Sequence, residues 1–203
     1  MYDLTETHRV FLAIIPPQDV RSSLRDAQRQ LKKYARNFRF VPLDQSHITL
    51  QFLGNGVSGH SITVLEDNLG PLISTFDSFT LTIDKLNFGF HSQTIARVLF
   101  YSMTDDSKLN EIVSQIHQLV KELELSDINR KKDHAKLINH LTIARTKSDT
   151  SRSFSREIRE AIKTINFKQL DFRVDEIKLI ESKFKDNQTV YTTLATFPLK
   201  DKG

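Results

Sequence analysis

Hydrophobic and polar positions along the chain follow two periods, one typical of β-strands and the other typical of α-helices. Apolar or alternating runs predict strands at residues 9–15, 38–41, 47–54, 79–88, 95–101, 137–144, 171–184 and 189–197. Apolar residues three and four positions apart predict helices that start near Asp19, Ser61, residues 105–107 and Ser151. Gly54 and Gly56 predict a turn after the third strand, and residues 185–188 predict a hairpin turn near the end.

The order of these predicted elements repeats along the chain. Strand, helix, strand, helix, strand occurs twice, with one further strand at the end, and an internal duplication accounts for this. We therefore predict one α+β domain over residues 1–203, with lobe-like halves at about 9–90 and 95–197. Each half is expected to be a sheet flanked by helices, and residues 1–8 and 200–203 are expected to be loose ends.

Length and composition fit a single globular domain. The 203 residues suffice for one substantial core, and 38% hydrophobic with 27% charged residues is near the globular average. The absence of cysteine excludes disulfides, thiolate metal sites and cysteine nucleophiles. The apolar run at residues 10–15 is short, follows a polar segment and ends at two prolines, so we expect no signal peptide and a cytoplasmic protein.

Charge permits an anionic partner such as RNA, because the net charge is +4 and the pI is about 9.2. Five basic residues lie opposite the apolar stripe of the first predicted helix: Arg21, Arg25, Arg29, Lys32 and Lys33. We interpret them as a solvated face rather than an RNA-binding surface. The basic stretch 130–134 is a candidate contact for RNA phosphates, although charged loops are more often only solvated. We expect a monomer without a membrane partner.

Two short motifs in equivalent places of the repeat carry the candidate chemistry. One reads His-Ile-Thr-Leu from His47, and the other reads His-Leu-Thr-Ile from His140. Side chains alternate between the faces of a strand, so His and Thr of each motif share one face and the apolar residues share the other. The duplication places the two motif strands on either side of a central groove.

Paired histidines suit acid-base catalysis at neutral pH, because imidazole has a pKa of about 6.5. If the two rings lie close, repulsion favours the state in which one is protonated and the other neutral. Thr49 and Thr142 add hydroxyl donors for the oxygens of a phosphate between the rings. Arg145 could supply a positive charge, but strand alternation places it on the opposite face from Thr142 unless the strand is irregular.

Other chemistries fit these residues less well. Each motif offers one imidazole and few nearby carboxylates, so we predict no metal site and no cofactor. Ser46 adjoins His47 but alternates to the other side of the strand, so a serine nucleophile is poorly supported. We therefore favour metal-free acid-base catalysis on a phosphodiester.

The chain resembles the two-histidine phosphoesterase superfamily, and within it the RNA 2′,3′-cyclic phosphodiesterases, also called 2′-5′ RNA ligases. The resemblance covers most of the chain: RVFLAIIPP at 9–17, HITLQFLG at 47–54, RVLFY at 97–101, HLTIAR at 140–145, and ESKF at 181–184 with VYTTLATFPL at 190–199. It implies a bilobal fold with two antiparallel-rich sheets, pseudo-twofold symmetry and a central cleft. It also implies metal-independent hydrolysis of a 2′,3′-cyclic phosphate, on RNA or a nucleoside, to a 2′-phosphate.

The resemblance also implies roles for individual residues. His47 corresponds to the general acid that protonates the departing 3′ oxygen, and His140 corresponds to the base that activates water. Phe52 and Tyr191 are candidates for stacking on a nucleobase, with core packing as the alternative for Phe52. Ser182 recurs in the family's last strand pair, whereas Asn139 replaces a usual proline.

Two alternative functions remain open. The first is 2′-5′ joining of RNA or cleavage of 2′-5′-linked oligonucleotides, which uses the same groups. The second is a binding module that holds an RNA end without turnover. Both histidines and both threonines disfavour the binding module, because a binder needs neither an acid nor a base.

Overall fold

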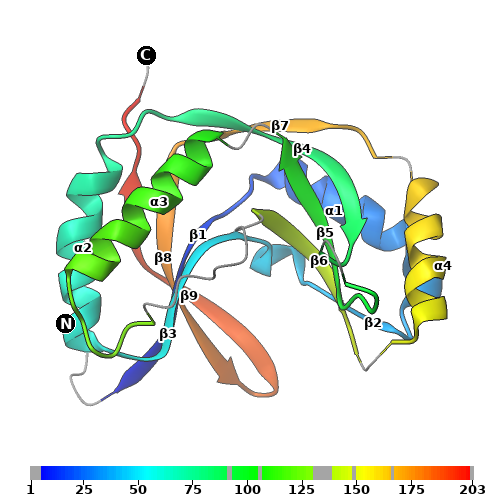
Figure 1. Ribbon diagram of the computed structural model, residues 1–203, viewed down its shortest axis with the longest axis horizontal. Helices are drawn as coiled ribbons and strands as arrows, with labels where there is room; N and C mark the ends of the chain where they lie inside the picture. Colours follow the sequence, from blue (N-terminus) through cyan, green and yellow to red (C-terminus); the bar gives the residue numbers. More distant parts are fainter. Residues whose placement is uncertain are drawn as a thin grey trace.

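Nine strands and four α-helices are present in the part of the chain that the computed structural model describes, residues 6–90, 93–104, 107–129, 139–147, 150–165 and 167–201. The strands are β1 (Thr7–Ile14), β2 (Phe38–Phe40), β3 (Ile48–Ser58), β4 (Phe79–Phe88), β5 (Val98–Thr104), β6 (His140–Thr146), β7 (Leu170–Val174), β8 (Glu176–Lys185) and β9 (Gln188–Pro198). The α-helices are α1 (Gln18–Gln30), α2 (Gly59–Ile73), α3 (Ser107–Glu122) and α4 (Arg152–Lys163), with 3-10 turns η1 (Lys32–Tyr34) and η2 (Leu43–Gln45). The predicted α+β class is confirmed (Figure 1).

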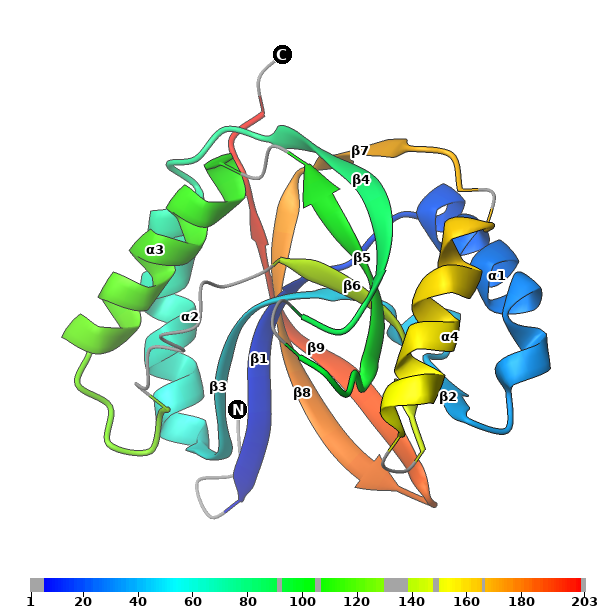
Figure 2. The ribbon, with the colours of Figure 1, turned by 45° about the vertical axis from the view of Figure 1, so that its right-hand side comes forward.

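These strands form one continuous sheet with two distinct halves. Their order is β7-β4-β5-β6-β3-β1-β8-β9, and β2 pairs with β6. The halves meet where β3 and β6 share the single residue pair Ile48 and Leu141, so the two predicted sheets are joined at one point. α2 and α3 pack together against one half, and α4 packs against β4 of the other. Figures 1 and 2 show α1 beside α4 at the opposite end of the molecule from α2 and α3.

Each half of the sheet draws strands from both parts of the chain, which corrects the predicted lobes at 9–90 and 95–197. β4 pairs with β5 and β7, which follow it in the second part of the chain. β8 and β9 return to the first part, where β8 pairs with β1. The apolar pattern of a strand indicates which face is buried but not which strand lies beside it. The sequence pattern therefore does not indicate that strands from the two parts of the chain pair with each other.

Several element boundaries differ from the predicted ones. β3 continues through Gly54 and Gly56 to Ser58, because β1 pairs with it as far as Thr7. Gly54 is buried where the chain after α3 approaches, and a Cβ there would lie 3.3 Å from the Asp127 carbonyl oxygen. Gly54 thus permits close packing rather than a turn. Because β1 begins at Thr7, the predicted loose end is shorter than residues 1–8.

The end of the chain also differs from the prediction. The strand expected at 171–184 divides at Asp175, and its two pieces, β7 and β8, pair with different neighbours. Lys200 pairs with Asp77 in an isolated bridge, so the expected loose end does not begin at residue 200. The expected features at residues 105–106, 130–134 and 137–138 lie outside the described residues.

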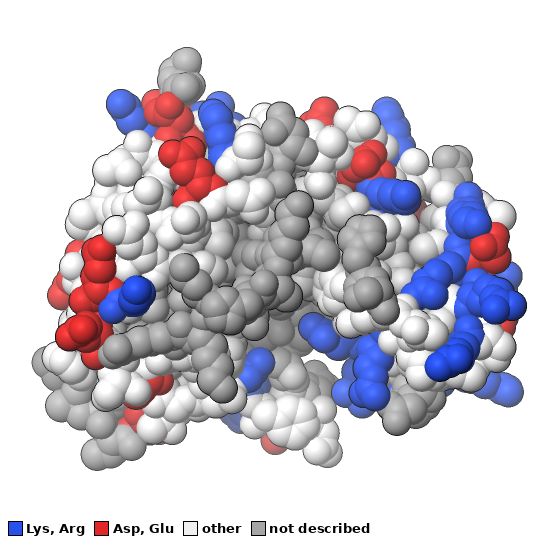
Figure 3. Space-filling model, in the orientation of Figure 1, with Lys and Arg blue, Asp and Glu red and all other residues white. Residues whose placement is uncertain are grey.

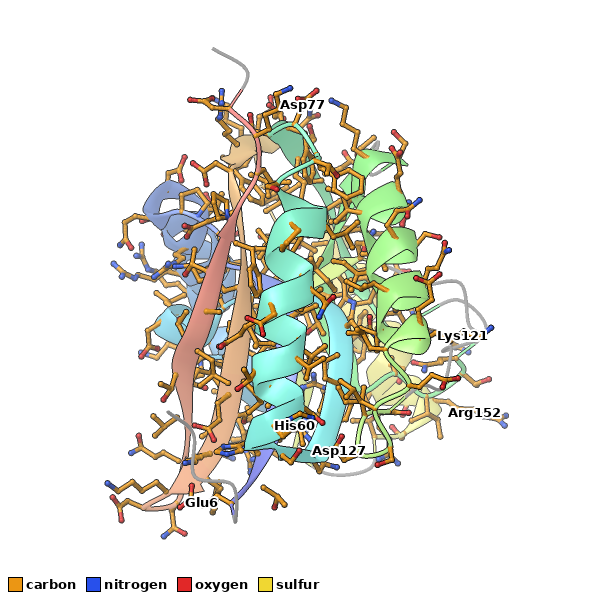
Figure 4. The ribbon with its side chains drawn as sticks, turned by 90° about the vertical axis from the view of Figure 1, so that its left-hand side faces the viewer. Glu6, His60, Asp77, Lys121, Asp127 and Arg152 are labelled. Atoms are coloured by element: carbon orange, nitrogen blue, oxygen red, sulfur yellow. The ribbon has the colours of Figure 1, made fainter. Side chains whose placement is uncertain are left out.

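The helix caps show how short polar side chains start these helices. Ser151 accepts a hydrogen bond from the Phe154 backbone N–H and caps α4, at the predicted start of this helix. α2 begins after Ser58, whose backbone N–H donates to the Asp127 carboxylate over 2.7 Å. Figure 4 shows Asp127 at this end of α2, close to His60. By contrast, α1 starts at Gln18 after Pro17, so the predicted start at Asp19 is one residue late.

The core lies between the sheet and the helices. Its residues include the apolar stripe predicted for α1, of which Val20, Leu24, Ala27 and Leu31 are buried. Ile48 and Leu141 are fully buried at the junction of the two halves, and they anchor the motif strands from beneath. None of the helices in the described ranges is both long and apolar enough to span a membrane.

Candidate active site

The two His-x-Thr motifs meet where the two halves of the sheet join. The residue between His and Thr in each motif, Ile48 or Leu141, pairs with its counterpart across the antiparallel junction. In this antiparallel register, His47 lies opposite Thr142 and Thr49 lies opposite His140. Their side chains point to the face of the sheet opposite from Ile48 and Leu141. Four polar residues therefore share one face: His47, Thr49, His140 and Thr142.

A β-bulge in β6 brings Arg145 to the same face as Thr142. Consecutive residues of β5 pair with Ala144 and Thr142, so Ile143 is an extra residue in the ladder. Ile143 and Ala144 are both buried, and alternation resumes with Arg145 exposed on the side of the motif hydroxyl. This bulge is the irregularity that the sequence required before Arg145 could reach the site.

An equivalent bulge lies in β3. Consecutive residues of β1 pair with Gln51 and Thr49, which leaves Leu50 as the extra residue. Leu50 and Ile143 each follow the Thr of their own motif directly. The two motifs thus share the same local backbone irregularity, and the site has the pseudo-twofold character that the sequence predicted.

One cleft of about 240 Å³ contains most of the predicted site residues. Its lining includes both histidines, both threonines, Arg145 and Tyr191. The remaining lining residues are Arg39, Phe40, Val41, Pro42, Gln45 and Thr189. Three segments that are far apart in the chain, within residues 39–49, 140–145 and 189–191, therefore converge on one small cleft.

Phe52 lies outside this cleft. Its ring packs against a small apolar cluster formed by Phe11, Ala13 and Ile180, and the Arg9 guanidinium lies 4.6 Å from the ring centroid. Phe52 is only partly buried, so its packing matches the core alternative in part. Because the ring does not line this cleft, base stacking by Phe52 stays a prediction.

His47 is held by the backbone and by two aromatic rings. Its Nδ1 donates a hydrogen bond to the Gln45 carbonyl oxygen over 2.8 Å. The ring centroid lies 4.9 Å from that of Phe11 and 5.3 Å from that of Tyr191. Because Nδ1 is occupied, Nε2 is the atom left to exchange a proton with a ligand.

The electrostatic surroundings disfavour a proton on His47 in the ligand-free site. Burial lowers the pKa of His47 from its ordinary value, and the charges of Arg145 and His140 lower it further, while the Gln45 carbonyl opposes the shift. Burial likewise raises the pKa of Tyr191, although Arg145 opposes that shift, so its hydroxyl remains a neutral donor. An anion bound between these groups would favour protonation of His47.

His140 lines the cleft, and the two phenylalanines that contact its ring line a second, larger hollow of about 970 Å³. The rings of Phe90 and Phe100 meet the His140 ring edge-on at 5.2 Å and 5.4 Å, and they stack on each other at 4.8 Å. Ser102 is the cross-strand partner of His140 and lines the hollow together with both phenylalanines. Aromatic and polar residues next to His140 therefore border an open space.

Sequence reasoning missed three polar residues of the cleft. Arg39 pairs directly with Arg145 across β2 and β6, and Gln45 donates a hydrogen bond from Nε2 to the Thr189 carbonyl oxygen over 2.6 Å. The basic composition of the segment around Arg39 was the only available signal. Their positions in the cleft follow from strand pairings between distant parts of the chain, which the sequence pattern does not encode.

Candidate metal ligands are sparse around this cleft. Across the described ranges, no three or more His, Asp and Glu side chains gather in a way that could hold a metal ion. The donors present are imidazole, hydroxyl, amide and guanidinium groups, and this set suits an anionic ligand better than a cation.

Comparison with known proteins identifies the family. The sequence model of the 2′-5′ RNA ligase superfamily matches residues 11–185. The chain belongs to the 2′-5′ RNA ligase superfamily. A relative from Thermotoga maritima, an RNA 2′,3′-cyclic phosphodiesterase, is 24% identical over 187 residues, with 92% of each chain covered.

Several solved structures share the fold of this chain. TT0787 of Thermus thermophilus has a TM-score of 0.74 at 24% identity, covering 96% of this chain and 100% of that chain. Escherichia coli LigT in its apo form has a TM-score of 0.70 at 22% identity, covering 97% and 99%. LigT has also been crystallised with 3′-AMP, and that structure superposes with a TM-score of 0.69 at 21% identity. The predicted two-histidine phosphoesterase fold is confirmed.

Asn139 lies directly before the second motif. It is buried, with a hydrogen bond from its Nδ2 to Asn110 Oδ1 over 3.0 Å. This side-chain bond ties the start of β6 to α3. It leaves the alternation that begins at His140 unchanged.

Proposed function

We propose that this protein hydrolyses the 2′,3′-cyclic phosphate of an RNA end or a nucleoside to a 2′-phosphate, without a metal ion. The observation that carries the proposal is the pairing of Ile48 with Leu141, which brings two imidazoles and two hydroxyls onto one face of one cleft. Membership of the superfamily and the activity of the Thermotoga maritima relative support the same reaction.

The proposed reaction uses the two histidines in different protonation states. Neutral His140 accepts a proton from water as the water oxygen forms a bond to phosphorus. Protonated His47 donates its Nε2 proton to the 3′ oxygen as the bond between phosphorus and that oxygen breaks. The products are a 2′-phosphomonoester and a free 3′ hydroxyl, and the next cycle begins when the proton on His140 is returned to solvent and His47 is protonated again.

The substrate itself supplies part of the driving force for protonating His47. The cyclic phosphodiester carries one negative charge, which opposes the effects of Arg145 and His140 on the pKa of His47. The Gln45 carbonyl accepts from Nδ1 in either state and stabilises the imidazolium. Thr49, Thr142 and Arg145 bind the non-bridging oxygens, on which negative charge is held in the transition state.

The hollow beside His140 favours a second candidate, the joining of RNA through a 2′-5′ bond. In that reaction a 5′ hydroxyl replaces water, transfers its proton to His140 and attacks the same phosphorus while the 3′ oxygen leaves. The hollow holds aromatic and polar groups suited to the incoming nucleotide: Phe90, Phe100, Asn87, Ser102 and Lys85. Reversal of these steps cleaves a 2′-5′ bond.

The test is incubation with RNA that ends in a 2′,3′-cyclic phosphate, with the phosphate position on the product read by NMR or by sensitivity to phosphatase. We expect a 2′-phosphate, activity that survives EDTA, and loss of turnover in His47→Ala and in His140→Ala. His60→Ala is the matched control, because His60 is exposed at the start of α2 and does not line the cleft (Figure 4). Turnover that persists in both active-site variants would refute the proposal, and a product with a new 2′-5′ bond would favour joining.

A further inference from the structure

Two guanidinium groups face each other at the mouth of the cleft. Arg39 of β2 and Arg145 of β6 are directly opposite in an antiparallel pair, and both are exposed and line the cleft. Neither forms an ion pair within the described part of the chain. Like charges directly opposite each other on a sheet are destabilising, so this arrangement favours an anion that contacts both.

The positive charge at the cleft exceeds what a cyclic phosphate needs. A 2′,3′-cyclic phosphodiester carries one negative charge, whereas the cleft presents two guanidinium groups and a histidine that becomes protonated. Arg145 lies on the strand of the second motif, so it serves the reacting phosphate. Arg39 lies on the neighbouring strand, one step further from the motif, and is free to contact the next phosphate of an RNA chain.

Basic residues continue from Arg39 along the half of the molecule that carries α1 and α4. Residues 18–39 contain seven Lys and Arg against two Asp, an excess larger than the net charge of +4 of the whole chain. α4 contains four Lys and Arg against two Glu, whereas α2 contains two acidic residues and no basic one. Figure 3 shows Lys and Arg gathered on the right, over α1 and α4, and mostly Asp and Glu on the left.

The basic residues nearest Arg39 connect the cleft to the end of α1. Lys147, just beyond β6, donates from Nζ to the Ala35 carbonyl oxygen over 3.0 Å, and its backbone N–H donates to Asn37 over 2.9 Å. Arg36, Lys32 and Lys33 are exposed in the same segment. We define these residues together with Arg39 and Lys147 as the basic track. From the sequence alone, Lys32 and Lys33 were interpreted as part of a solvated face. Their continuity with the cleft changes that interpretation.

We propose that the basic track binds the phosphodiester backbone of an RNA chain whose terminal cyclic phosphate occupies the cleft. The preferred substrate is then an oligoribonucleotide rather than a mononucleotide, and Arg39 contacts the phosphate next to the reacting one. This inference rests on the proposed function for the identity of the end group. Backbone contacts of this kind are electrostatic and carry no sequence preference.

The experiment compares kcat/KM for a short RNA ending in 2′,3′-cyclic phosphate with kcat/KM for the corresponding cyclic mononucleotide, across a KCl series. We expect the RNA to be preferred at low salt and its kcat/KM to fall more steeply with salt, by a slope of about 0.7 for each phosphate contact. Arg39→Gln should lower the ratio of the two kcat/KM values about 10-fold, and the triple variant K32Q/K33Q/R36Q should reduce the salt slope for RNA.

The matched control is K108Q/K121Q, which removes the same kind of charge from α3 in the other half of the molecule. It should leave the ratio and the salt slope as in the wild type. Equal kcat/KM values and equal salt slopes for the two substrates in the wild type would refute the proposal that the basic track binds RNA. Variants that lower kcat/KM for both substrates by the same factor would also refute it.

Failure of the proposed function is recognised separately, because neither substrate would then be turned over. In that event, fluorescence anisotropy with a 3′-phosphate-ended RNA still tests the basic track. Weaker binding and a smaller salt slope in the triple variant than in K108Q/K121Q would support it. Indistinguishable binding curves for the two variants would refute it.

Discussion

Replacing the motif threonines by valine tests the phosphate-binding role with little change to the fold. Thr49 and Thr142 are half-buried on the cleft face, and neither hydroxyl has a hydrogen-bond partner among the described residues. Valine keeps the branched shape that suits a strand, so only the hydroxyl is lost. We expect the free energy of unfolding to change by less than about 0.5 kcal/mol.

In the proposed function, each hydroxyl donates a hydrogen bond to a charged phosphate oxygen, and the expected loss of activity follows from removing that bond. Such a bond contributes about 1.5–3 kcal/mol. Each of Thr49→Val and Thr142→Val should therefore lower kcat/KM about 10- to 150-fold. Because both hydroxyls would bind the same phosphate, their effects need not multiply, and the double variant should lose more activity than either single variant.

The assay is the rate of 2′-phosphate formation from a cyclic mononucleotide, with Tm measured on the same samples. Thr49→Ser and Thr142→Ser restore the hydroxyl and should recover most of the activity. Thr196→Val on β9, which is exposed and outside the cleft, is the matched control. A loss below about threefold in both single variants, with Tm unchanged, would show that the hydroxyls do not bind the phosphate.

Two further predictions concern titratable groups. Burial, reinforced by Arg145 and His140, lowers the pKa of His47. If His47 is the proton donor, kcat/KM should therefore decline with rising pH around a midpoint below about 6.5. A midpoint above that value would contradict the role of His47 as proton donor. Burial raises the pKa of Asp127, but hydrogen bonds from Ser61 and Ser58 outweigh this effect and lower the pKa overall. The Asp127 carboxylate therefore stabilises the fold at pH values above its unfolded pKa of about 4. This stabilisation is lost as the pH falls through the lower pKa of the folded state. Asp127→Asn should lower Tm at neutral pH, and the difference from wild type should narrow in acid; an equal difference at both pH values would contradict the capping role.

The periodic patterns of the sequence predicted the local elements well where neighbouring residues decide the structure. β4 begins and ends at the predicted residues 79 and 88, and Ser151 caps α4 because its side chain reaches a backbone N–H three residues later. The end of β3 was predicted wrongly, because Gly54 and Gly56 indicate a turn only when no partner strand continues beside them.

The candidate site likewise contains residues that the sequence pattern predicted and residues that only strand pairing brings there. The sequence identified both histidines, both threonines, Arg145 and Tyr191, because their types and spacing are visible along the chain, and all of them line the cleft. It missed Arg39, since that residue enters the site only through the pairing of β2 with β6. It also placed Phe52 among the candidates, whereas the ring packs beneath Arg9 outside the cleft.

The amino-acid sequence by itself determined the alternation of each motif strand, and hence that His and Thr of one motif share a face. Only the tertiary structure decided that the two faces coincide, because one pair, Ile48 with Leu141, joins the halves of the sheet. It also decided that Arg145 turns toward the site, because the bulge at Ile143 shifts the alternation by one residue. The physical reason is that alternation depends on covalent geometry between neighbours, whereas pairing and bulges depend on hydrogen bonds between strands far apart in the chain.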